Sequence, residues 1–272
     1  MAMLDANLHP AHAHKPTQFQ TLTVVSVVLA LVNMTWGLID TRMVDGAFVW
    51  MKPLKFSLSF ILLFATLALV EKRLSERLRS GWLMLLIGWV MAAAFLSEMA
   101  YMMYQAARAE ASHFNLSTPF NEFMYTVVMA TGAVVLVACV GLIGWLVKRD
   151  RNAALTPTLR ESIWLGFLLS FALTMIVAGY LSGTGGHHVG LHPEGAATFP
   201  LVGWSGVTGD LRPAHFFSLH AMQLVPLFAL WVERRNFANP VKAIRLFAFG
   251  YAGLTLVVFA IALAGLPLIP LG

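Results

Sequence analysis

The residues of this sequence best suited to chemistry are histidines. The chain has nine of them, and imidazole is both the commonest transition-metal ligand and the commonest proton-transfer group near neutral pH. Three stand within the first fourteen residues, in a stretch that we expect to be a polar tail. The remaining six are candidate metal ligands: His113, His187, His188, His192, His215 and His220.

The spacing of these histidines matches no zinc signature such as His-Glu-x-x-His. Three of the histidines in the second half of the chain, His187, His188 and His192, stand in a glycine-rich stretch. His215 and His220 are five residues apart, which is about 140° around a helix, so they do not form a chelating pair on one face. A metal site would therefore need ligands from different segments. The alternative is that several of these histidines only hydrogen-bond to loops.

Two carboxylates are candidates for acid–base chemistry, Glu98 and Asp210. Glu98 stands in a long apolar run, where an ionisable group is costly and usually faces the interior of a bundle. We expect it either to pair with Lys55 or Arg108 or to be protonated. Asp210 precedes Pro213, so it is expected to cap a helix or to orient a nearby imidazole.

Four cations, Lys52, Lys55, Arg108 and Arg212, could hold an anionic group such as a carboxylate, a phosphate or a haem propionate. A different interpretation is that they only pair with the acidic residues of the same loops. Lys55 could also extend its amine to the lipid head groups.

The composition excludes most soluble protein classes. The 272 residues are 58% hydrophobic and 11% charged, against about 25% charged in soluble domains. The net charge of +5 therefore indicates contact with lipid head groups rather than with nucleic acid. A single cysteine, Cys139, excludes an intrachain disulfide and a cysteine-based zinc cluster.

Seven apolar stretches are long enough to cross the hydrocarbon core as helices, which takes about 20 residues. They are residues 21–38, 54–70, 82–103, 123–147, 163–181, 216–232 and 244–268. The sequence predicts an all-α, polytopic seven-helix bundle. Residues 1–19 would be a polar cytoplasmic tail, with no cleavable signal before the first span. Residues 20–272 would form one transmembrane domain with an ordered outer loop at about 183–213.

Lysine and arginine set the expected orientation. Most of them fall in the loops after the second, fourth and sixth spans, so these loops are predicted to be cytoplasmic. The amino terminus is then inside and the carboxyl terminus outside. The six candidate histidines all lie toward the outer side. We expect a multi-pass protein of a bacterial-type inner membrane.

These features favour a metal-dependent membrane enzyme acting at the outer face on a small lipophilic or anionic substrate. The metal would be divalent zinc, copper or iron, and it would polarise a substrate oxygen or activate water. One alternative is a b-type haem protein that exchanges electrons with quinone. Another is a non-enzymatic transporter, sensor or assembly factor.

Overall fold

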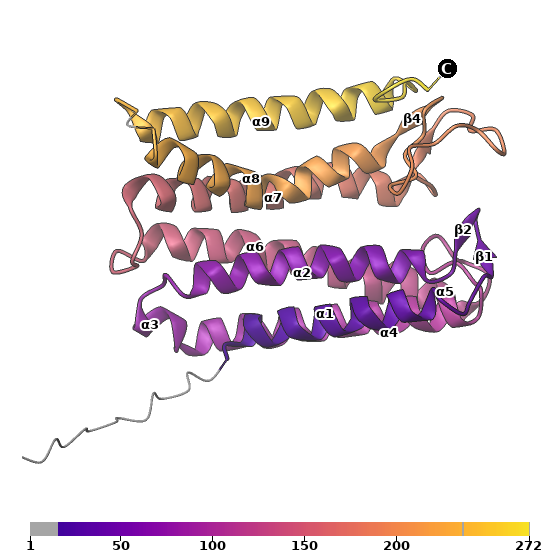
Figure 1. Cartoon of the computed structure of the whole chain (residues 1–272), viewed down its shortest axis with the longest axis horizontal. Coiled ribbons are helices and arrows are strands. Elements are labelled where there is room, and N and C mark those ends of the chain that lie inside the picture. Colours follow the sequence, from indigo (N-terminus) through magenta and orange to yellow (C-terminus); the bar gives the residue numbers. More distant parts are fainter. Residues whose placement is uncertain (1–15, 236, 272) are drawn as a thin grey trace, which may run out of the picture.

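The protein is a bundle of seven long apolar helices, as the computed structural model shows for residues 16–235 and 237–271 (Figure 1). The predicted tail, with His9, His12 and His14, falls almost entirely outside the described residues. The prediction of seven spanning helices in an all-α membrane protein is confirmed. Six of the spans are each one uninterrupted α-helix: α1 (Gln18–Trp36), α2 (Met51–Glu71), α4 (Trp82–Ala107), α7 (Pro157–Gly183), α8 (Leu211–Glu233) and α9 (Pro240–Leu263).

The fourth span is continuous but not uniform. It runs over Pro119–Arg149 and consists of α5 (Pro119–Phe123), the π-helical turn η1 (Met124–Met129) and α6 (Ala130–Arg149). Short elements connect the spans: α3 (Glu76–Arg79), the hairpin β1 (Met43–Val44) with β2 (Ala47–Phe48), and the pair β3 (His188–Val189) with β4 (Gly209–Asp210). The π-helical turn was not foreseen from the sequence.

The helices form two groups that meet along α6 and α7. Helices α1, α2, α4 and α6 share one apolar core, in which Phe95 packs with ring centroids 4.6 Å from Phe60 and 5.1 Å from Phe64. Helices α7, α8 and α9 pack on smaller cores of their own. A Cβ on Gly166 of α7 would lie 2.8 Å from the backbone oxygen of Ala221 in α8, so a glycine allows this close approach.

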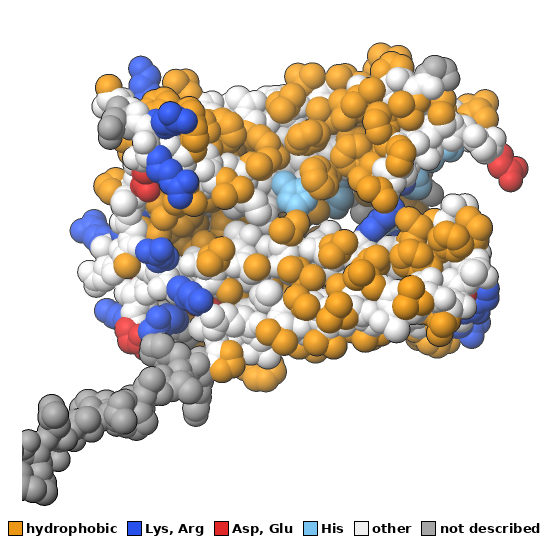
Figure 2. Space-filling view, viewed as in Figure 1, with side chains coloured by type: hydrophobic (Ala, Val, Ile, Leu, Met, Phe, Trp, Pro, Cys, Tyr) orange, Lys and Arg blue, Asp and Glu red, His pale blue; other side chains and the backbone are white. Residues whose placement is uncertain are grey.

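Basic residues concentrate at one end of the bundle (Figure 2). There Glu161 of α7 accepts hydrogen bonds from Lys148 of α6 and, at 2.8 Å, from Arg245 of α9. This ion pairing joins three helices at the end that the distribution of lysine and arginine places in the cytoplasm. The candidate site lies at the opposite end.

Helix α8 begins at Leu211, five residues before the predicted start of the sixth span. The reason is the cap: the Asp210 carboxylate accepts a hydrogen bond from the backbone N–H of Arg212 at 2.9 Å. This is the N-cap role expected for Asp210. The extra turn brings Arg212 and His215 onto the helix.

Candidate functional site

The long outer loop between α7 and α8 folds back on itself beside the start of α8. Strands β3 and β4 pair antiparallel, with His188 opposite Asp210, and the Leu211 N–H donates to the His187 carbonyl at 2.9 Å. The Thr208 hydroxyl donates to the Val189 carbonyl at 2.8 Å. These bonds hold the histidine-bearing half of the loop against the cap of α8.

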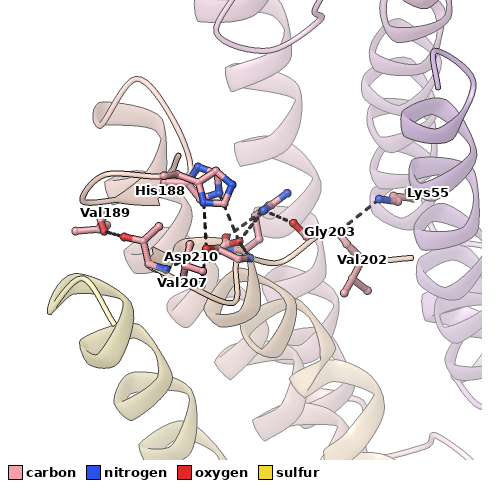
Figure 3. Close-up of polar contacts among 11 residues, drawn as sticks. Lys55, His188, Val189, Val202, Gly203, Val207 and Asp210 are labelled. Carbon is pink, nitrogen blue, oxygen red and sulfur yellow. Dashed lines mark hydrogen bonds and ion pairs between the residues drawn. The ribbon is translucent and has the colours of Figure 1, made fainter. Parts of the chain in front are cut away.

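Asp210 and Arg212 form a nearly buried ion pair at the centre of this loop (Figure 3). Arg212 donates from Nε at 2.9 Å to Oδ1 and from Nη2 at 2.6 Å to Oδ2. The same Nη2 donates to the Gly203 carbonyl at 2.6 Å, and the Ser205 N–H donates to Asp210 at 2.8 Å. Burial would raise the pKa of Asp210, but the guanidinium and the backbone N–H groups outweigh it and lower that pKa. Asp210 is therefore ionised and fully engaged.

Three imidazole rings lie close together beside this ion pair: His188 and His192 are stacked, and His187 is tilted by 58° from His188. The ring centroids of His187 and His188 are 4.1 Å apart, and those of His188 and His192 are 3.9 Å apart. His192 Nδ1 lies 3.1 Å from the Ser205 hydroxyl. His188 Nε2 is buried, has no hydrogen-bond partner, and lies 4.0 Å from the Asp210 carboxylate, beyond hydrogen-bonding distance.

His187 and His188 are neutral at pH 7. Burial lowers the pKa of His187 to about 4, and the positive charge of Arg212 acts in the same direction. Burial likewise lowers the pKa of His188 to about 4, with His192 as the next largest cause. Neutral imidazoles have a free lone pair, so these rings can accept a proton or coordinate a metal ion.

Lysines from α2 face this loop across the bundle. Lys55 Nζ lies 3.4 Å from the Val202 carbonyl, and Figure 3 shows Lys55 reaching from α2 toward the loop. The positive charges of Lys55 and Arg212 repel each other. Lys52, one turn earlier, acts on the charges of both His113 and His187. Two cations of α2 therefore share this region with Arg212.

His113 and His215 extend the histidine group inward. Burial lowers the pKa of His113 well below its ordinary value, and the charges of Lys52 and His215 lower it further. His113 follows α4, and its Nδ1 lies 3.1 Å from the Ser112 hydroxyl. His215 Nδ1 is buried without a hydrogen-bond partner. Segments distant in sequence thus bring these two imidazoles near each other.

His220 lies deeper along α8. Its Nδ1 lies 3.2 Å from Gln223 Oε1, and its ring centroid lies 4.2 Å from that of Phe216. Gln223 Nε2 donates at 3.3 Å to the Thr66 hydroxyl of α2. This side-chain bond and the Lys55 contact connect α8 and its loop to α2.

Figure 2 views the molecule from the side, across the helix axes, and shows a groove between the two helix groups. Histidine side chains are visible within it, and a lysine or arginine side chain lies nearer its outer end. The groove therefore opens sideways, toward the position of the lipid, as well as toward the outer end.

Two predicted site residues lie apart from this group. Arg108 pairs with Glu110 at 2.7 Å and stacks on Tyr104, and no contact joins it to Lys55 or Arg212 within the described residues. Glu98 is buried, at 4% exposure, against Gly132 of α6, and its Oε1 has no hydrogen-bond partner. Of the two alternatives expected for Glu98, pairing with Lys55 or Arg108 is wrong, because Arg108 has a nearer carboxylate and Lys55 reaches the loop. The other alternative, a protonated Glu98, stays a prediction.

A ready-made metal ligand set is not present. In residues 16–235 and 237–271, no three His, Cys, Asp or Glu side chains are arranged to hold a metal ion. The stacking accounts for this in part, since the rings of His188 and His192 are only 22° from parallel. Nearly parallel rings direct their lone pairs side by side instead of toward a common point.

Several groups that shape the region were not foreseen. They are the backbone carbonyls of Val202 and Gly203, the hydroxyl of Ser205, and the Gln223–Thr66 bond. Backbone acceptors have no sequence signal, because every residue type has a carbonyl. Gln223 stands out in the sequence as an amide beside His220 in an apolar helix, but its partner Thr66 carries no such signal.

Comparison of the chain with models of protein families, with curated proteins and with solved structures finds no match.

Proposed function

We propose that the protein binds an amphipathic anion, with a carboxylate or phosphate head and an apolar body, in the outer half of the groove between α2 and α8. The observation that carries this proposal is an excess of cations. Lys52, Lys55 and Arg212 share the region. Asp210 pairs with Arg212 and accepts from two backbone N–H groups, Asp45 acts on the charge of Lys52, and among the described residues Lys55 hydrogen-bonds only to the Val202 carbonyl. A second negative charge would complete the site.

An apolar body fits the walls and the opening of the groove. Phe216 is 45% exposed and lies next to Trp204, with ring centroids 5.7 Å apart. The groove opens toward the lipid in the side view (Figure 2), so a ligand dissolved in the outer leaflet has a direct path. Ligand sites of this kind combine apolar walls with a few placed polar groups.

The neutral histidines supply the chemistry of such a site. With pKa values of about 4, His187 and His188 are unprotonated at pH 7 and can accept a hydrogen bond from a hydroxyl group of a bound substrate or from water. An enzyme that acts on a lipophilic anion at the outer face is the activity this arrangement favours.

The affinity for a defined probe tests this proposal. The full chain in neutral maltoside detergent is titrated with dodecyl phosphate, and binding is measured by native mass spectrometry. The Lys55→Gln variant is expected to bind about tenfold more weakly, since a charge-assisted contact contributes roughly 1.5–3 kcal/mol. Arg42→Gln, on another outer loop and paired with Asp40, is the control and should bind like the wild type. Equal binding of dodecyltrimethylammonium would refute the proposal.

A metal ion at the stacked histidines is the second candidate. The supporting observation is the buried, unpartnered Nε2 of His188 beside two further imidazoles. Holding a metal would require the rings to rotate until their lone pairs converge. Elemental analysis of protein purified without a histidine tag should then find one zinc, copper or iron per chain in the wild type and none in His188→Gln. An absorption spectrum of the same sample tests the haem alternative through its Soret band.

A further inference from the structure

A second basic site lies at the opposite, cytoplasmic end of the bundle. A cavity of about 720 Å³ opens there between the start of α4 and the end of α6. Its volume falls within the roughly 300–1,000 Å³ typical of ligand sites. Arg77, Arg149 and Arg151 line it, together with Trp82 and Leu146.

Several other arginines at this end of the bundle have partners. Arg79 pairs with Glu76, Arg245 pairs with Glu161, and Arg160 donates to backbone carbonyls. In the part of the chain that the structure describes, no carboxylate lies within ion-pair distance of Arg77, Arg149 or Arg151. The preference for basic cytoplasmic loops explains why arginine is there. Arg73, Arg234 and Arg235 also lack an ion pair among the described residues, so the distinguishing feature of Arg77, Arg149 and Arg151 is that all three line one cavity.

The carboxylate in the cavity wall is engaged elsewhere. Asp150 accepts hydrogen bonds from the backbone N–H of Ser75 at 2.8 Å and of Asn152 at 3.3 Å. These bonds join the loop after α2 to the loop after α6 and so hold the cavity open between them. Asp150 therefore has a structural role, and its single negative charge offsets only one of the three arginine charges.

The walls of the cavity suit a lipid more than a free ion. Trp82 is 74% exposed at the first residue of α4 and Trp145 is 40% exposed near the end of α6. Tryptophan at such positions marks the membrane–water interface. Arg149 lies over the Trp145 ring, 4.3 Å from its centroid. The cavity thus combines a basic rim with apolar and aromatic walls at the level of the inner head groups.

We infer that this cavity binds the head group of an anionic glycerophospholipid of the inner leaflet, with the three guanidinium groups on its phosphate. Arginine holds phosphate with two parallel hydrogen bonds, and basic pockets between membrane helices on the cytoplasmic side are suited to such head groups. The glycerol and the acyl chains pass along Trp82 and Leu146 into the bilayer. This site is separate from the outer groove and does not depend on the function proposed for it.

Fluorescence quenching localises the lipid. The full chain in neutral detergent is titrated with brominated phosphatidylglycerol or with brominated phosphatidylcholine of the same acyl chains. The decrease in tryptophan emission that the lipid causes in the wild type but not in Trp82→Phe comes from Trp82, and it therefore reports on lipid in the cavity. We expect phosphatidylglycerol to quench this component at 10-fold to 100-fold lower concentration, because each basic residue contributes about fivefold near an anionic lipid surface.

Two triple variants with the same change of charge make the test specific. Arg77→Gln/Arg149→Gln/Arg151→Gln should lose the preference for phosphatidylglycerol. Arg234→Gln/Arg235→Gln/Lys242→Gln, on the cytoplasmic loop between α8 and α9, should retain it. Size-exclusion profiles establish that both variants fold. If the arginine triple variant does not fold, its three single variants replace it, and each is expected to lose part of the preference for phosphatidylglycerol. Equal quenching by the two lipids, or a preference that survives removal of the three arginines, would overturn the inference. Displacement by sodium phosphate, but not by sodium chloride of equal ionic strength, would overturn it in favour of a soluble anion.

Discussion

An ion pair between the first and third residues of an Asp-x-Arg sequence occurs twice at the outer end of this protein. Comparing the two pairs predicts how much burial changes their contribution to stability. In both Asp40-Thr41-Arg42 and Asp210-Leu211-Arg212, the arginine donates from its backbone N–H to Oδ1 and from Nη2 to Oδ2. The pairs differ in burial. The arginine side chain is 50% exposed in the first and 31% in the second, and the aspartate side chain is 12% exposed in the first and 1% in the second.

Asp210→Asn removes the charge but keeps a side-chain oxygen that can cap α8. Breaking a buried ion pair by removing one partner costs about 3–5 kcal/mol. We take the lower end, about 3 kcal/mol, because Arg212 is partly exposed and keeps its bond to the Gly203 carbonyl. Asp210→Ala should cost about 1 kcal/mol more, since the cap is lost as well. Asp40→Asn is the matched control, and solvent screening should make its effect much smaller.

The assay is reversible unfolding in mixed micelles at pH 7, with the free energy of unfolding as the measured quantity. Because the pKa of Asp210 is lowered, its contribution is present at neutral pH and is lost as the pH falls through the folded-state pKa. The Asp210→Asn difference should therefore shrink at low pH. Equal losses for Asp40→Asn and Asp210→Asn at pH 7 would refute the reasoning, because burial would then have no effect.

Three further predictions follow from the same structure. The pKa of His187 and of His188 is about 4, while an unfolded chain takes up these protons near pH 6.5. The free energy of unfolding should therefore fall from pH 7 to pH 5 by about 1 kcal/mol per histidine, discounted for partial exposure. Unfolding of His187→Gln/His188→Gln should show a flatter pH profile, and an unchanged profile contradicts the assignment. Gly166→Ala places a Cβ 2.8 Å from a backbone oxygen and should lower the free energy of unfolding by about 1–3 kcal/mol. Gly250→Ala, with nothing within 4 Å, should be neutral or stabilising in the same measurement. Glu98→Gln keeps the shape of a buried group that has an unpartnered oxygen, and glutamine cannot ionise, so thermal unfolding should occur at the same or a higher temperature. A large decrease would reveal an ionised partner.

The seven helices could be predicted because their apolar runs are long and the bilayer sets their length. Helix starts were less accurate, since capping extends a helix beyond its apolar run. Asp210 shows this: its capping role is readable from the sequence, and the structure adds five residues to the sixth span there. The π-helical turn at Met124–Met129 has no simple pattern, because it differs from an α-helix by one residue in hydrogen-bond spacing.

The candidate site was predicted in kind more than in arrangement. Residue type and depth identified Asp210, Arg212 and the histidines as unusual groups for an apolar chain. Which carboxylate pairs with which cation depends on how the helices are rotated. For Glu98 the expected partner was wrong, because this side chain faces Gly132 of α6, and no feature of a single apolar sequence specifies that rotation.

The division of the bundle into two helix groups has a mechanical consequence. The groups meet continuously along α6 and α7, whereas the α2–α8 side is bridged by side chains such as Gln223 and Thr66. A rigid-body rotation of one helix group about the contact between α6 and α7 would change the width of the groove without unwinding any helix. The Gln223–Thr66 hydrogen bond would oppose such a rotation, because it joins the two helix groups across the groove.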